Sequence, residues 1–89
     1  MVRQMSRIAL IGIMVEDISA AGRINEILHE YGEYIIGRMG LPHAGHELSV
    51  ISVVLDAPSD IISAVSGKLG QIKGVSSKTI YSKQKEERL

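Results

Sequence analysis

The chain has 89 residues, enough for one domain, and its 10 basic residues balance its 10 acidic residues to a formal net charge of zero. It has no cysteine, which excludes a disulfide scaffold, a thiolate metal site and a cysteine nucleophile, and which fits a cytoplasmic location. The neutral charge makes direct DNA binding unexpected, and three tyrosines without tryptophan or phenylalanine offer few rings for stacking on single-stranded nucleic acid.

The first half of the chain predicts a strand, a helix and a second strand. Ser6–Glu16 is rich in β-branched residues and too short to span a bilayer. Asp17–Gly32 follows as an amphipathic helix, capped at its start by Asp17 or Ser19 and at its end by Gly32 in a left-handed conformation. Its apolar stripe consists of Ile24, Ile27, Leu28 and Tyr31. Glu33–Leu41 is a weaker strand that contains two glycines.

The second half repeats this order after a turn. Pro42–Gly45 forms the turn, and His46–Ala57 is a strongly apolar third strand. Pro58 and Ser59 open a second helix, which ends at Gly74. The residues expected to share one face of this helix are Ile61, Ile62, Val65, Leu69 and Ile72. Val75–Lys83 is the fourth strand, and the charged tail 84–89 lies outside an ordered core of residues 6–83.

The order β-α-β-β-α-β predicts an α+β fold of the ferredoxin-like, ACT-like kind over residues 1–89. Two right-handed split β-α-β units would interleave into a four-stranded antiparallel sheet of order 4-1-3-2, with both helices on one face. The first and third strands would then be central, and both are apolar on both sides. The fourth strand alternates apolar with polar residues or lysine, as suits an edge.

This arrangement leaves an apolar sheet face without helices to cover it. Monomers rarely expose such a patch, so we expect a homodimer or higher homo-oligomer that packs sheet against sheet. A bound small molecule or a partner protein are the alternatives. The residues expected at this interface are Leu10, Met14, Leu48, Val50 and Val54.

The junction between the first strand and the first helix is a candidate ligand site. Glu16, Asp17 and Ser19 lie at a predicted helix N-terminus, where free backbone amides can receive a carboxylate or a phosphate. A small effector of amino-acid size is therefore one interpretation of Val15–Ala20. The alternative is ordinary helix capping by Asp17, which requires no ligand.

A divalent transition metal is the alternative to a protein without cofactors. His43 and His46 lie in the predicted turn with Glu47 beside them, and imidazole and carboxylate groups suit zinc or nickel. Two ligands from each subunit could complete such a site. Within one chain the remaining histidine is His29, on a helix, and a solvated polar turn is the other interpretation.

The sequence offers no support for catalysis. Gly67 and Gly70 flank Lys68 in the last turns of the second helix, whereas a phosphate loop needs its glycines before a helix. Close helix packing and helix termination explain them better. No serine lies in a G-x-S-x-G motif, and no histidine is placed near an acid–base partner. We therefore expect that the protein is not an enzyme.

Several segments resemble a small bacterial family of iron-only (FeFe) hydrogenase system regulators. The most specific is Ser66–Val75, SGKLGQIKGV, followed by Lys78 and Thr79. The others are the first strand ending in Val15-Glu16-Asp17, the helix residues Asn25–His29 and the Gly-Leu-Pro turn. The resemblance extends from about Arg7 to Lys83.

The family is similar to ACT-type sensor domains and to the metal-sensing domain of nickel-responsive repressors. The resemblance implies a regulatory role connected with hydrogenase expression or maturation, a cytoplasmic location and oligomeric assembly. The nickel-responsive proteins use a cysteine at their metal site, and this chain has none. Transcriptional control would then act through a partner, and the rival hypotheses are a metal-sensing or DNA-binding regulator that uses His43 and His46, or a structural adaptor between proteins.

Overall fold

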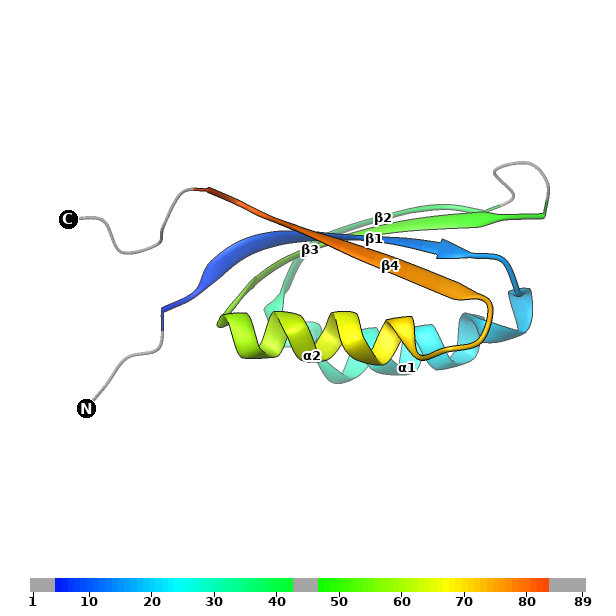
Figure 1. Ribbon diagram of the computed structural model, residues 1–89, viewed down its shortest axis with the longest axis horizontal. Helices are drawn as coiled ribbons and strands as arrows, with labels where there is room; N and C mark the ends of the chain where they lie inside the picture. The colour runs from blue at the N-terminus through cyan, green and yellow to red at the C-terminus, as the bar shows by residue number, and fades with distance from the viewer. Residues whose placement is uncertain (1–4, 43–46, 84–89) are drawn as a thin grey trace.

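The computed structural model describes residues 5–42 and 47–83, which form one antiparallel sheet with two helices packed beneath it (Figure 1). The strands are β1 (Arg7–Val15), β2 (Ile35–Leu41), β3 (Ser49–Ala57) and β4 (Val75–Tyr81). The helices are α1 (Ala21–Glu30) and α2 (Ser59–Gly70), with short 3-10 turns at Ile18–Ala20 and Gly32–Tyr34. The strand order is β2-β3-β1-β4. The predicted fold and sheet order are confirmed.

Alternation along the central strands decides which side chains form the core. Successive residues of β1 point to opposite faces, so Ala9, Ile11, Ile13 and Val15 are buried against the helices. The predicted stripe of α1 packs on them through three buried residues and the partly buried Tyr31. The buried residues in the described part of the chain are Ala9, Ile11, Ile13, Val15, Ala20, Ile24, Ile27, Leu28, Val53, Leu55, Ala57, Ile62, Val65, Leu69 and Val75.

The edge strand β4 is tied to α2 by hydroxyl groups as well as by its apolar residues. Ser77 Oγ donates to the backbone oxygen of Ser66 at 3.1 Å, and Thr79 Oγ1 donates to Ser66 Oγ at 3.1 Å. These residues face the helices at half-buried positions. Because the hydroxyls satisfy one another, the polar residues of this edge strand are retained on its helix side at little cost.

Several predicted boundaries were wrong, and three of them have a clear local reason. The third strand begins at Ser49 rather than His46, because Glu47 adopts a left-handed φ of 57° that no strand residue has. Gly32 is not a left-handed cap but the first residue of the 3-10 turn Gly32–Tyr34, which replaces the start of the predicted second strand.

The second helix ends at Gly70, before the predicted Gly74, which instead precedes β4 with a φ of 80°. Gly67 does not provide close helix packing either, because a Cβ atom placed there would meet open space.

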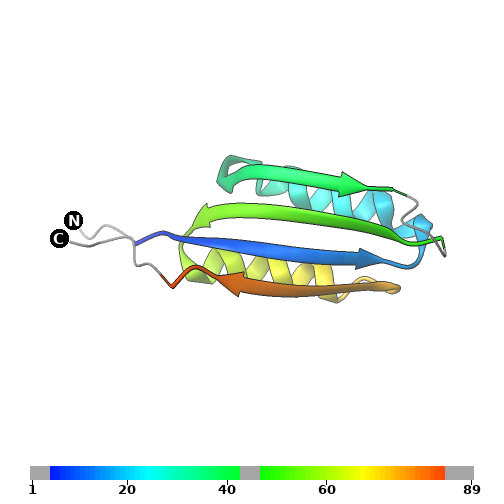
Figure 2. The ribbon, with the colours of Figure 1, turned by 90° about the horizontal axis from the view of Figure 1, so that it is seen from above.

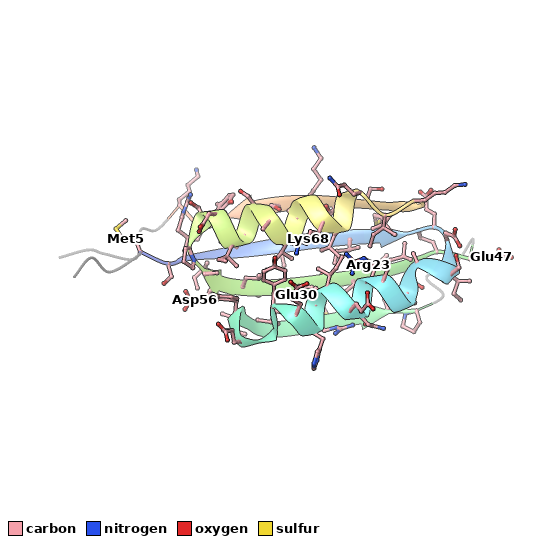
Figure 3. All side chains as sticks on the ribbon, turned by 90° about the horizontal axis from the view of Figure 1, so that it is seen from below. Met5, Arg23, Glu30, Glu47, Asp56 and Lys68 are labelled. Atoms are coloured by element: carbon pink, nitrogen blue, oxygen red, sulfur yellow. The ribbon has the colours of Figure 1, made fainter. Side chains whose placement is uncertain are left out.

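Lys68 nevertheless joins the two helices on their outer side. Its Nζ lies 3.4 Å from Glu30 Oε2 and 5.0 Å from the centre of the Tyr31 ring (Figure 3).

Candidate functional site

The sheet face opposite the helices carries most of the exposed large apolar side chains of the described residues. We call it the open face; in Figure 2 it lies toward the viewer, with both helices behind it. Strand register places on it Ile8, Leu10, Gly12 and Met14 of β1, Val50, Ser52, Val54 and Asp56 of β3, Met39 and Leu41 of β2, and Ser76, Lys78 and Ile80 of β4.

Most of the exposed large apolar side chains lie on this open face. They are Ile8, Leu10, Met14, Met39, Leu41 and Ile80, and their exposed fractions run from 37% to 70%. Val50 and Val54 between them are half-buried by their neighbours. Four of the five predicted interface residues therefore share this surface. The fifth, Leu48, is half-buried and precedes the first paired residue of β3.

The predicted ligand residues meet at the junction between β1 and the 3-10 turn Ile18–Ala20, but two of them bind each other. Asp17 Oδ1 accepts the backbone N–H of Ser19 at 3.0 Å and the Ser19 hydroxyl at 2.7 Å. These hydrogen bonds stabilise the ionised carboxylate and hold the pKa of Asp17 below its ordinary value of 3.8. The geometry is that of an N-cap, as the capping interpretation states.

We expect the contribution of Asp17 to stability to disappear in acid. Its pKa is lower in the folded chain than in the unfolded chain, so the stabilisation is present above pH 3.8 and is lost as pH falls through the folded value. Thermal melts near neutral pH should show Asp17→Ala less stable than the wild type, and the difference should narrow below pH 3.8. Ser19→Ala should lie between them, because the backbone bond remains. An Asp17→Ala defect of the same size at both pH values contradicts this assignment.

The same junction carries too many carboxylates to attract an anion. A hollow beside it is lined by Val15, Glu16, Asp17, Ile18, Glu47 and Ser49, three of which are acidic. A carboxylate or phosphate placed there would meet like charges, which oppose binding. The structure thus brings Glu16, Asp17 and Ser19 together at the start of the 3-10 turn, in surroundings that oppose an anion, and binding of a small effector at this junction stays a prediction.

A better-formed cavity lies on the flank between α1 and β2, and sequence reasoning missed it. Its volume is about 220 Å³, and its walls come from α1, β2, β3 and the junction before α1. The lining residues are Val15, Ile18, Ala21, Ile24, Asn25, Arg38, Gly40, Leu41, Pro42, Ser49, Val50 and Ile51. None of them is acidic. The feature of the sequence that could have indicated this cavity is Arg38, the single arginine of an edge strand, which lies between Gly37 and Gly40.

Arg38 and Asn25 form the polar part of this cavity. Arg38 Nη2 donates to Asn25 Oδ1 at 2.8 Å, a bond that connects β2 with α1. The two residues also line a shallower hollow with Leu28, His29, Gly32 and Ile35, so they stand between two depressions on one flank. This hydrogen bond fixes a guanidinium group at the edge of an apolar cavity.

The predicted metal ligands His43 and His46 lie outside the described residues. Within residues 5–42 and 47–83, no three His, Asp or Glu side chains gather in a way that could hold a metal ion. In the same residues no helix is long and apolar enough to cross a membrane.

A comparison with models of protein families identifies the family of this chain. The family model described as "TM1266-like: Iron-only hydrogenase system regulator, putative" matches residues 7–79. The chain belongs to the TM1266-like family. This confirms the resemblance read from Ser66–Val75 and the first strand. The description of the TM1266-like family as regulators is also consistent with a protein that is not an enzyme.

A solved structure of the TM1266-like family has the same fold. The uncharacterized protein TM1266 from Thermotoga maritima is 39% identical, with a TM-score of 0.83 over 88% of this chain and 99% of that one. Weaker similarity links the chain to the divalent ion tolerance protein CutA1 from Ehrlichia chaffeensis, at 17% identity and a TM-score of 0.48 over 89% of this chain and 84% of that one.

The nitrogen regulatory PII-like protein CPII from Thiomonas intermedia K12 is similarly distant. It is 12% identical, with a TM-score of 0.49 over 91% of this chain and 98% of that one. Similarity at this level carries no inference about what this member of the TM1266-like family does. None of the curated proteins matches the chain in sequence.

Proposed function

We propose that this protein is a homo-oligomeric regulatory module of the iron-only hydrogenase system, in which two copies pack open face against open face. The observation that supports this most directly is the concentration of exposed apolar side chains on that one surface. A surface on which exposed apolar side chains gather in this way marks an interaction site on a protein in water. The description of the family supports the regulatory part.

The size of the open face suits a second copy. Four strands of up to nine residues cover a rectangle of roughly 20 by 30 Å. A stable protein interface buries about 800 Å² on each partner, which a rugged surface of those dimensions provides. A domain this short buries a modest fraction of its own surface, so association adds apolar burial that the monomer lacks.

The charges on the open face favour a symmetric partner. Asp56 stands near one end of the face, and its Oδ1 is shielded from solvent without a hydrogen-bond partner among the described residues (Figure 3). Lys78 lies on the same face in β4. In a two-fold interface each contact occurs twice, so one acidic and one basic group on the same face can pair reciprocally with those of a second copy.

A regulator built this way acts through what changes its assembly. A small effector or a protein partner that binds one arrangement better than another shifts the population toward it. Control of transcription would then proceed through such a partner, since the net charge of zero provides little of the phosphate attraction that direct DNA binding requires.

Light scattering during size-exclusion chromatography tests the assembly. We expect the wild-type protein to elute at twice the mass of one chain, or a higher even multiple, at micromolar concentration. Dilution should shift the equilibrium toward the monomer, because non-covalent assembly depends on the protein concentration. A wild-type protein that remains monomeric throughout this range contradicts the proposal.

A further inference from the structure

The cavity between α1 and β2 combines an apolar lining with one cation whose charge is not neutralised by a carboxylate of the described residues. Among the described residues, the ion pairs join Arg23 to Glu26 and Lys68 to Glu30, and neither pair includes Arg38. The guanidinium of Arg38 uses one nitrogen on Asn25 and bonds no other described group. Its remaining N–H groups are available to an acceptor from outside the chain.

A carboxylate is the acceptor that this geometry suits best. The planar guanidinium fork matches the two oxygens of a carboxylate, and Asn25 already holds the fork in place. Ligand sites in general combine apolar walls with a few fixed polar groups that set orientation. We propose that this cavity binds a short aliphatic carboxylate, with its carboxylate on Arg38 and its apolar tail against Ile18, Ala21 and Ile24.

The volume of the cavity limits the size of the ligand. A dry cavity of about 150 Å³ accommodates benzene, with its six carbons, so about 220 Å³ accommodates roughly nine non-hydrogen atoms. Gly40 creates part of this space. It pairs with Ile51 on the helix side of β2, and a Cβ atom placed there would meet no atom within 4 Å. Any side chain at position 40 would therefore occupy volume that the ligand needs.

The cavity shares part of its wall with the open face. Gly40, Leu41 and Val50 are among the residues that line the cavity, and the same three residues line a shallow depression on the open face with Met39 and Ser52. A ligand that stiffens or shifts this end of β2 thus acts on the surface where the second copy is proposed to pack. This coupling rests on the proposed function, whereas binding itself does not.

Titration with 4-methylpentanoate, followed by amide chemical shifts of the ¹⁵N-labelled full chain, tests the site. We expect shifts clustered on α1 and β2 around Ala21, Asn25 and Gly40. The uncharged isostere 4-methylpentanamide should bind about tenfold more weakly or worse, because it cannot form the charged pair with Arg38. Equal affinity for acid and amide, or shifts confined to other surfaces, overturns the proposal.

Three variants refine the test. Arg38→Gln removes the charge and should weaken binding of the acid about tenfold or more, while leaving that of the amide nearly unchanged. Gly40→Val fills the cavity at a strand position that favours valine, so the chain should fold and bind neither compound. Arg23→Gln is the matched control, since Arg23 is an exposed arginine of α1 on the side that faces α2 (Figure 3). Binding by Gly40→Val at wild-type affinity excludes this cavity as the site.

Light scattering with and without 4-methylpentanoate separates this inference from the proposed function. A shift of the monomer–oligomer midpoint that Gly40→Val abolishes supports both binding and coupling. Binding to a wild-type protein that is monomeric throughout supports the cavity and contradicts the proposed assembly. An oligomer that neither binds nor responds to the compound leaves the assembly supported and overturns the ligand site.

Discussion

We expect Val53→Lys to unfold the protein, and Val54→Lys, one residue further along the same strand, to fold but lose its oligomeric state. The two side chains point to opposite faces of β3. Val53 is fully buried between the sheet and the helices, whereas Val54 is half-buried on the open face beside Leu10. The pair therefore separates core from interface with one chemical change.

The expected cost at Val53 approaches the whole stability of the domain. Burial lowers the pKa of a lysine by about 3–5 units, which corresponds to roughly 4–7 kcal/mol. A chain of this length is stable by about 4–13 kcal/mol in total. At Val54 a lysine can extend its amine to water in the monomer, but two facing copies would bury like charges at their interface.

Circular dichroism and light scattering on the two variants provide the measurement. Val53→Lys should lose its cooperative thermal transition, and Val54→Lys should retain it while eluting as a monomer. Ser63→Lys, on the exposed side of α2, adds the same charge elsewhere and should behave as the wild type. Val50→Lys is a less clean choice, because Val50 also lines the α1–β2 cavity. If Val54→Lys assembles as the wild type does, the open face is not the interface.

Local patterns in the sequence were sufficient for the fold and for the two sheet faces. The alternation of Leu10 with Ala9 and Ile11 distinguishes an exposed from a buried side of β1, because the side-chain period of a strand is two. The stripe from Ile24 to Leu28 identifies the buried side of α1 in the same way. Such signals lie within one element, so they can be read without knowing its neighbours.

The α1–β2 cavity depends on relations between elements, which explains why the sequence did not reveal it. The pairing of β2 with β3 shifts between Ile35 and Gly37, so that Ile36 is an extra residue in β2. Without this bulge, strict alternation from Ile35 would turn Arg38 toward the open face. The bulge places Arg38 on the helix side instead, within reach of Asn25. No local pattern in the sequence indicates that the pairing of β2 with β3 shifts there.

The candidate site at Glu16, Asp17 and Ser19 shows the converse case. The residue types and their position at a helix start were identified correctly, but their hydrogen-bond partners were not determined by position alone. The Asp17 carboxylate already accepts a hydrogen bond from Ser19. A further carboxylate, that of Glu47, comes from the segment just before β3. Electrostatics between segments distant in sequence therefore oppose the binding of an anion at this junction, and the residue types alone could not show this.

We expect Gly74→Ala to destabilise the protein strongly and Gly67→Ala to stabilise it, although both lie in the segment Ser66–Val75. Gly74 has a φ of 80°, a conformation that costs an alanine about 1–2 kcal/mol. An added Cβ atom would also lie 2.5 Å from Asp17 Cβ and 3.3 Å from the Asp17 backbone nitrogen. The backbone at Asp17 would have to move, which disturbs the 2.7 Å bond from Glu16 N–H to the Gly74 carbonyl oxygen.

Together these effects should cost Gly74→Ala roughly 2–5 kcal/mol, a fall of about 10–30 °C in melting temperature for a domain of this size. Gly67 lies in the interior of α2 at an exposed position, where a methyl group meets nothing. Alanine there should add about 0.5–1 kcal/mol through helix propensity. Thermal and urea melts of both variants check the opposite signs. Equal stabilities of the two variants would contradict the role of Gly74 in joining the end of β1 to the start of β4. They would also mean that the close approach of Gly74 to Asp17 is not part of the native packing.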